Sequence, residues 1–175
     1  MARAAARLDP EALYEYAVRA LARRGRSEAE LRRLLARRAD SLAAITAVVA
    51  RLRAHGYLDD ARLAEHSARF ERDRACHGRL RALQQLRARG LAPALAAAAV
   101  GRAYAEADED VLLAAFCRKK RLAAPQSPRQ AASALNKLRR AGFSVAACQR
   151  ALRAWRLDPA WGDMLESSEV EEEQA

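Results

Sequence analysis

The sequence is poor in the residues that many fold classes depend on. Of its 175 residues, 5% are aromatic, five are proline and seven are glycine. The hydrophobic share of 51% is raised by alanine, which is the best helix former. Large apolar side chains are therefore scarce, which argues against a thick β-sandwich and favours a thin, helical core.

The sequence also lacks long apolar runs. There is no stretch of 18 apolar residues, so we expect no membrane-spanning helix and no membrane partner. The first residues include arginines but no apolar segment of the kind found in a secretory signal. Cys76, Cys117 and Cys148 are odd in number and far apart, which favours reduced thiols over a disulfide framework. We therefore expect a cytoplasmic protein.

Positive charge is what the chain has in excess. It carries 32 Lys and Arg against 22 Asp and Glu, a formal net charge of +10. Seven of the acids lie in residues 158–175, which hold no Lys or Arg, so residues 1–157 carry 32 basic and 15 acidic groups. A basic body with an acidic tail predicts a polyanion or an acidic protein surface as partner. One hypothesis is that the tail imitates DNA and shields the basic body.

Apolar side chains recur every three or four residues along most of the chain, which is the spacing of amphipathic helices. This pattern predicts an all-α protein of about nine helices, built from tandem three-helix modules in an elongated, curved array. The modules are placed at 10–58, 59–106 and 107–157, between a flexible N-terminus at 1–9 and an acidic, mostly disordered tail at 158–175. The grouping rests on an imperfect repeat, since Leu86-Arg-Ala-Arg-Gly-Leu91 resembles Leu138-Arg-Arg-Ala-Gly-Phe143.

A structural joint between two helices is expected near residue 58. Gly56 suits the left-handed residue that closes a helix, with Tyr57 after it as the apolar contact. Asp59 is the expected N-cap of the next helix, and Asp60 suits the positive end of that helix's dipole. The leucines on either side of the cap have the spacing of a hydrophobic staple. The joint comprises Gly56, Tyr57, Leu58, Asp59, Asp60 and Leu63.

The helical pattern also assigns large apolar side chains to buried faces. Because aromatic residues are few and do not alternate with basic ones, Tyr57 is assigned to the core rather than to stacking on a base, and Trp155 likewise. Trp161, in the tail, is either a docked anchor or a loose contact. Four more residues are assigned to inward faces: Phe70, Leu80, Val111 and Val145.

Three segments resemble the bacterial RecX family, strongly over residues 18–91 and more weakly beyond. The most specific is His55-Gly-Tyr-Leu-Asp-Asp-Ala-Arg-Leu63, which is similar to that family's Tyr-Leu-Asp-Asp signature. Arg26-Ser-Glu-Ala-Glu-Leu-Arg-Arg33 is similar to its first-module motif. The chain departs from the pattern at Gln85, where glutamate is usual, and at Ala39, where glycine is common. Residues at the spacing of the second-module motif are Gly78, Arg81, Gln84, Leu86, Arg89, Gly90 and Leu91.

The resemblance implies a non-enzymatic regulator without a cofactor. RecX proteins are thought to lie in the groove of the RecA–DNA filament and to inhibit strand exchange and ATP hydrolysis by RecA. That activity modulates recombination, DNA repair and the SOS response. The expected partners are the RecA filament and, more weakly and by charge, single- and double-stranded DNA. The protein is expected to be a monomer.

The candidate contacts with RecA or DNA form a basic ridge. Arginine suits this role because its planar fork donates two parallel hydrogen bonds to a phosphate or a carboxylate. For each of these residues the alternative is an ordinary solvated helix face. The ridge comprises Arg24, Arg26, Arg32, Arg33, Arg37, Arg38, Arg69, Arg72, Arg74, Arg79, Arg81, Arg87, Arg89, Lys119, Lys120, Arg121, Lys137, Arg139 and Arg140.

Other functions are less well supported by the sequence. Without the resemblance, the leading alternative is a basic DNA-binding protein with a helix-turn-helix unit in residues 27–38 and the helix after them; a helical adaptor for another protein comes third. His55, His66 and His77 recur every eleven residues, but there is no Cys-x-x-Cys pair, so no metal is expected. Phosphate-loop and nucleophile-elbow motifs are absent, so no catalytic residue is expected.

Overall fold

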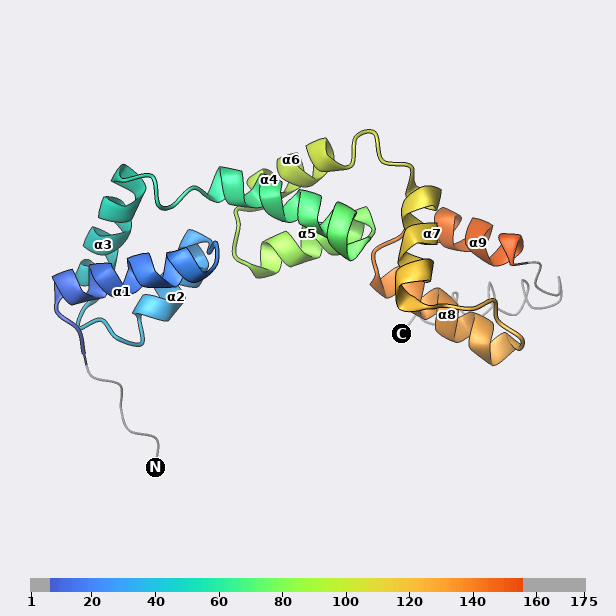
Figure 1. The fold of residues 1–175 in the computed structure, drawn as a ribbon, viewed down its shortest axis with the longest axis horizontal. Coiled ribbons are helices and arrows are strands. Elements are labelled where there is room, and N and C mark those ends of the chain that lie inside the picture. The colour runs from blue at the N-terminus through green and yellow to red at the C-terminus, as the bar shows by residue number, and fades with distance from the viewer. Residues whose placement is uncertain (1–6, 156–175) are drawn as a thin grey trace, which may run out of the picture. The chain divides into compact units, whose positions relative to one another are not determined.

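A computed structural model describes residues 7–155, and within that range the chain is all-α, as the sequence predicts (Figure 1). It forms nine α-helices and no β-strand there; the one β-bridge joins Leu8 to Ala39. No helix in this range is long and apolar enough to cross a bilayer. The elements are α1 Pro10–Arg23, α2 Glu28–Leu35, α3 Leu42–Ala54, α4 Asp60–Phe70, the π-helical turn η1 Glu71–Ala75, α5 Arg79–Ala88, α6 Pro93–Ala103, α7 Glu109–Lys120, α8 Pro128–Arg140 and α9 Val145–Ala154.

Short polar side chains start the helices where the sequence places them. Ser27 accepts the amide hydrogen of Glu30, and the Glu30 carboxylate accepts that of Ser27, so the capping box of α2 is confirmed. Ser127 and Ser144 cap α8 and α9 through their hydroxyl oxygens. Each cap satisfies a backbone N–H that a helix start would otherwise leave unpaired.

The predicted joint between α3 and α4 is confirmed in its backbone geometry. Gly56 has φ +72°, and the amide of Tyr57 donates to the carbonyl of Leu52 at 2.9 Å, which closes α3. Asp59 caps α4, since its carboxylate accepts the amide of Arg62 at 2.8 Å. The carboxylate of Asp60 reaches further than predicted, because it accepts the amide of Glu28 at the start of α2 at 3.0 Å.

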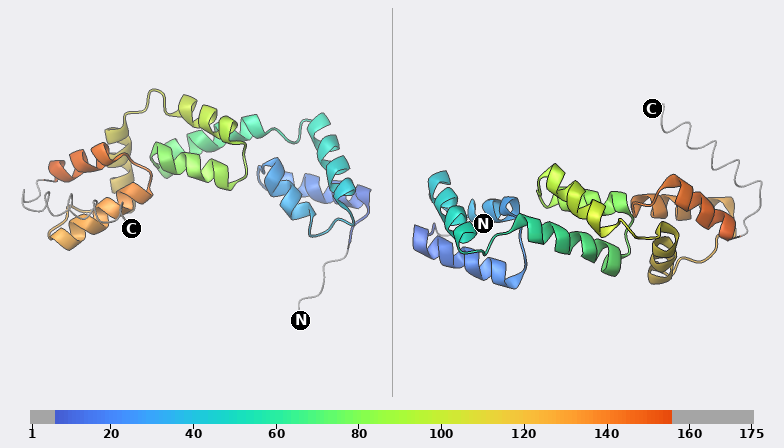
Figure 2. Two further views of the ribbon diagram at one scale, coloured as in Figure 1. Left: turned by 180° about the vertical axis from the view of Figure 1, so that it is seen from behind. Right: turned by 90° about the horizontal axis from the view of Figure 1, so that it is seen from above.

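Tertiary contacts divide the described chain into two compact units. Unit 1 holds residues 7–68 and 84–101, and unit 2 holds residues 69–83 and 102–155. Figure 2 shows their helices from two further sides. The core of unit 1 is centred on Leu13, Leu31, Leu35 and Leu52, and that of unit 2 on Leu113, Phe116, Leu138, Phe143 and Cys148. The three module boundaries and the array that they would form stay predictions.

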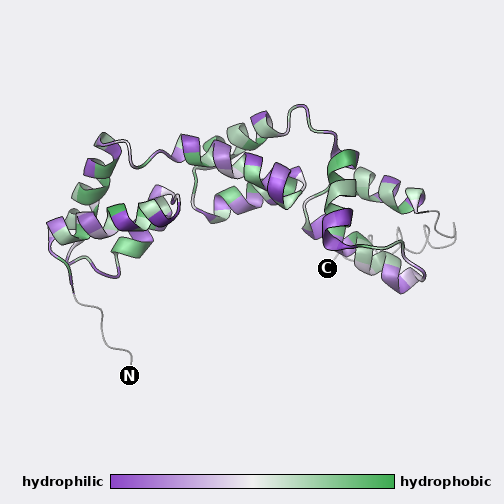
Figure 3. Ribbon diagram, in the orientation of Figure 1, coloured by the Kyte–Doolittle hydropathy of each residue, from purple (hydrophilic) through white to green (hydrophobic). Residues whose placement is uncertain are grey.

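Five assignments to the core are wrong. The exposed fractions are 53% for Tyr57, 52% for Phe70, 57% for Leu80, 63% for Val111 and 43% for Val145. Val111 lies outside the face of α7 that buries Leu113 and Phe116, and Tyr57 lies in the turn after α3. For the other three, the reason is that alanine sets the buried face of the helix: Ala64 and Ala68 of α4, Ala82 of α5 and Ala147 of α9 are completely buried. Small side chains allow close helix approach, so neighbouring large residues turn outward. Figure 3 shows hydrophobic and hydrophilic residues interspersed along these helices.

Trp155 differs from these five residues. It is partly buried and packs against the core of unit 2, next to α9. Its assignment to the core is thus confirmed for part of the side chain. Trp161 and the rest of the acidic tail lie outside the described residues.

The two repeat segments end their helices in the same way. Gly90 follows α5 with φ +82°, and Gly142 follows α8 with φ +88°. Their amides donate three residues back, at 2.8 and 2.9 Å, and the next residues, Leu91 and Phe143, donate five residues back and are buried. The sequence likeness therefore corresponds to one shared turn geometry, which requires glycine at the left-handed position.

Candidate interaction surface

In unit 1, the end of α5 packs against the start of α2; we call this contact the α2–α5 joint. The hydroxyl of Ser27, fully buried, donates to the carbonyl oxygen of Arg89. A Cβ added to Gly90 would lie 2.6 Å from the Cβ of Ala29, so the glycine also permits the close approach. Ser27 thus serves both as the cap of α2 and as the contact to the next helix end.

Arg89, a residue of the candidate ridge, holds this joint together. Its guanidinium donates to the hydroxyl of Ser67 at 2.8 Å, the carbonyl of Gly25 at 2.7 Å and the carboxylate of Glu30 at 3.0 Å. Burial alone would raise the pKa of the Glu30 carboxyl, but the hydrogen bonds from Arg89 and Ser27, with the charges of Arg89 and Arg24, lower it overall. Arg89 is therefore committed to the fold.

In unit 2, the end of α8 packs against the start of α5 in a related way; we call this contact the α5–α8 joint. The amide of Gly78 donates to the carbonyl of Ala141 at 2.8 Å, and the amide of Leu80 donates to that of Gly142 at 3.2 Å. The N–H groups that open α5 are satisfied by carbonyls that close α8. A Cβ at Gly78 or at Gly142 would overlap backbone atoms of the other segment, so both positions require glycine.

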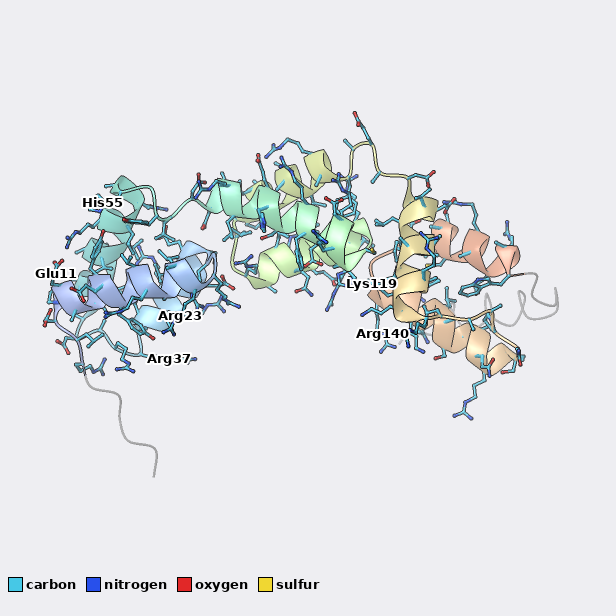
Figure 4. All side chains as sticks on the ribbon, in the orientation of Figure 1. Glu11, Arg23, Arg37, His55, Lys119 and Arg140 are labelled. Atoms are coloured by element: carbon cyan, nitrogen blue, oxygen red, sulfur yellow. The ribbon has the colours of Figure 1, made fainter. Side chains whose placement is uncertain are left out.

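Positive charge accumulates around the α5–α8 joint. Residues 111–155 contain ten Lys and Arg and no Asp or Glu. Most of these cations stand in the last turns of α7 and α8, where they interact favourably with the negative end of the helix dipole. Lys119, at the end of α7, donates to the carbonyl oxygen of Arg74 at the end of η1, which brings a third basic segment to the same region. Figure 4 labels Lys119 and Arg140 at these helix ends.

Ten of the predicted ridge residues already have a partner within the chain. Arg24, Arg32, Arg72 and Arg89 bind carboxylates. Main-chain oxygens accept hydrogen bonds from Arg26, Arg33, Lys119 and Arg140. The charged groups of Arg38 and Lys120 lie over the rings of Tyr16 and Phe116.

The other ridge residues fall into two sets. Three make further interactions within the chain: Arg69, Arg81 and Arg139. Six have side chains that form no hydrogen bond or ion pair with the part of the chain that the structure describes: Arg37, Arg74, Arg79, Arg87, Arg121 and Lys137. All six are exposed, and Figure 4 labels Arg37 among them. These six, which we call the free cations, can bind an anion without first breaking an internal contact.

The histidines are used in local pairs. His55 Nδ1 lies 2.7 Å from the hydroxyl of Tyr14, and His77 Nδ1 lies 2.6 Å from the carboxylate of Glu71. Tyr104 donates its hydroxyl hydrogen to the carbonyl of His77 at 2.9 Å, and burial raises the pKa of this phenol. Within residues 7–155 no three His, Cys, Asp or Glu side chains converge as metal ligands would. The spacing of the histidines in the sequence does not predict their pairs with Tyr14 and Glu71.

Comparison with known proteins identifies relatives. No protein-family model matches the chain. It is 44% identical over 81 residues to "Regulatory protein RecX" of Deinococcus radiodurans, a match that covers 46% of this chain and 38% of that protein. Its fold is similar to the crystal structure of RecX from Lactobacillus salivarius, with a TM-score of 0.68, 16% identity and coverage of 85% and 97% of the two chains. A second crystal structure of regulatory protein RecX gives a TM-score of 0.61, 17% identity and coverage of 80% and 71%.

Proposed function

We propose that this chain, a member of the RecX family, is a non-enzymatic regulator that binds the RecA–DNA filament in the cytoplasm and inhibits strand exchange and ATP hydrolysis by RecA. The 44% identity to a curated RecX protein carries this proposal. Through RecA, the chain would modulate recombination and DNA repair. DNA itself is the weaker partner in this proposal.

The free cations supply the contact surface that such a regulator needs. A RecA–DNA filament presents phosphates and carboxylates, both of which bind guanidinium groups well. A cation that is already paired must give up its partner before it can bind another, whereas the free cations lose only hydration. We therefore place the contact on the free cations, which are Arg74, Arg79, Arg121 and Lys137 of unit 2 and Arg37 and Arg87 of unit 1.

Binding to filaments and to bare DNA can be compared directly. We expect the protein to bind RecA filaments formed on labelled single-stranded DNA at concentrations far below those at which it binds the same DNA alone, as measured by fluorescence anisotropy. Equal affinity for both would indicate plain DNA binding and would contradict the proposal. A sequence-specific footprint on duplex DNA would favour the helix-turn-helix alternative.

The contact surface is tested by removing charge in matched sets. Changing Arg79, Arg121 and Lys137 to glutamine should weaken filament binding about tenfold or more. If all three contact phosphates, the steepness with which the logarithm of the binding constant falls with the logarithm of the salt concentration should decrease by up to about three. The control set removes the same charge from three ion-paired, exposed arginines: Arg19, Arg51 and Arg53. Equal effects of the two sets, with unchanged circular dichroism, would show that only net charge matters.

A further inference from the structure

Unit 2 contains a groove between α7 and α9 with a volume of about 530 Å³. Its lining is mostly apolar and includes Leu113, Cys117, Leu122, Ala151 and Trp155. A space of this size accepts a few large side chains, and apolar linings of this kind are typical of binding sites. The α5–α8 joint does not use this groove, and the proposed filament contact shares only Arg121 with it.

Arginines surround the apolar lining. Arg118, Arg121 and Arg150 line the groove, with Asp110 as the acid among the lining residues. Arg150 is paired with that Asp110, through hydrogen bonds of 2.8 and 2.9 Å. Arg118 and Arg121 have no carboxylate partner among residues 7–155. The groove therefore suits an occupant that combines large apolar side chains with acidic ones.

The chain itself carries such a segment shortly after the last residue that lines the groove. Trp155 lines the groove, and the sequence continues for 20 residues beyond it. Residues 158–166 hold three large apolar side chains and three acids and no Lys or Arg. The apolar residues are Trp161, Met164 and Leu165, and the acids are Asp158, Asp163 and Glu166. Five residues separate Trp155 from Trp161, a connection that spans up to about 20 Å when extended.

We propose that residues 158–166 bind in the α7–α9 groove of their own chain. Trp161 and its apolar neighbours fill the space beside Leu113 and Trp155, while the tail acids pair with Arg118 and Arg121. A connection this short holds the tail near the groove at an effective concentration of about millimolar, so even a weak contact is populated. This occupant matches the groove in apolar volume, in charge and in distance along the chain.

The docked tail would compete with an anionic partner. Arg121 lines the groove and is also one of the free cations, so a bound tail neutralises part of the surface assigned to the filament. That consequence rests on the proposed function, whereas the docking itself does not. The docking is therefore tested on the protein alone, without RecA or DNA.

Cys117 provides a native thiol in the groove for this test. In full-length protein, Cys76 is changed to serine, and Cys148 stays in place because it is fully buried. A second thiol is introduced by Gly162→Cys, which keeps all three apolar anchors. After oxidation with copper phenanthroline, we expect an intramolecular disulfide with Cys117 that forms about tenfold faster than with Gln174→Cys, the control at the tail end.

A further variant separates docking from simple tethering. Trp161→Ala, added to Gly162→Cys, keeps the tether length but removes the main anchor, so the cross-linking rate should fall about tenfold, which corresponds to 1.4 kcal/mol of docking free energy. Equal rates with and without Trp161, or equal rates for the two thiol positions, would overturn the proposal. Cross-linked dimers in place of monomers would show that the tail binds a second copy, which also overturns it.

Discussion

Arg87 and Arg89 show that two residues of the same type, close together in the sequence, can have different structural roles. They are two positions apart in a segment with no acidic residue, and both belong to the predicted ridge. Arg89 is partly buried and donates to three groups in unit 1, whereas the Arg87 side chain is exposed. The difference depends on contacts with Gly25, Glu30 and Ser67, which are more than 20 residues away. No local pattern contains that information.

Replacing each arginine by glutamine should separate the two roles. Arg89→Gln should lower the free energy of unfolding by about 1–3 kcal/mol, because it removes charge-assisted hydrogen bonds and leaves the Glu30 carboxylate without this partner. Arg87→Gln should stay within about 0.5 kcal/mol of the native protein. Urea denaturation followed by circular dichroism measures both. Similar losses from the two variants would contradict the structural role of Arg89.

Glycine substitutions test the close approach at the α5–α8 joint. Gly56→Ala meets no atom within 4 Å, so it should cost only the strain of a left-handed alanine, about 1–2 kcal/mol. Gly142→Ala carries the same strain, and its methyl group also overlaps the backbone of Arg81. We expect a distinctly larger loss, about 3 kcal/mol or more, in thermal or urea unfolding. If Gly142→Ala and Gly56→Ala cost the same, the joint is not as tight as described.

At the scale of elements, helix starts and ends were predictable because they depend on nearby residues. Ser27, Asp59 and Ser144 each cap a helix through an amide three residues away. The buried faces were harder to predict, since an alanine-rich helix can turn almost any side to its neighbour. Leu80 faces outward because Ala82 faces in. The joints themselves are contacts between distant segments, so only their turns could be predicted from the sequence.

The α2–α5 joint should weaken in acid. The pKa of Glu30 is lower in the folded protein than its ordinary value of about 4.3. The ionised carboxylate therefore stabilises the fold when the pH is above the ordinary pKa. This contribution is lost as the pH falls through the lowered pKa. Glu30→Gln should be less stable than the native protein at pH 7, and the difference should shrink below about pH 4. A pH series of urea melts checks this, and a constant difference would contradict it.

Across the whole molecule, charge is distributed by segment more than by residue. Residues 74–105 and 111–155 contain no Asp or Glu, whereas residues 157–175 contain no Lys or Arg. This separation of basic and acidic segments is visible in the sequence, and it predicts an anionic partner. The sequence could not show which cations are free, because pairing depends on the fold. The six free cations reduce a ridge of nineteen residues to a set that mutation can test.

The tail should affect DNA binding through these charges. Truncation after Leu157 removes seven carboxylates and no basic residue. If the tail neutralises cations of unit 2, the truncated protein should bind single-stranded DNA more tightly, with the largest gain at low salt, where charge interactions are least screened. Fluorescence anisotropy at two salt concentrations measures this effect. An unchanged affinity for DNA at both salt concentrations would contradict the hypothesis that the tail shields these cations.

Inhibition of RecA decides whether the chain acts as a regulator. The steady-state rate of ATP hydrolysis by RecA on single-stranded DNA is measured while the protein is titrated in. We predict that the rate falls at concentrations well below those that bind bare DNA, and that the change of Arg79, Arg121 and Lys137 to glutamine shifts this inhibition to higher concentration. A rate that stays constant until the DNA itself is bound by the protein would contradict a regulator of the RecA filament.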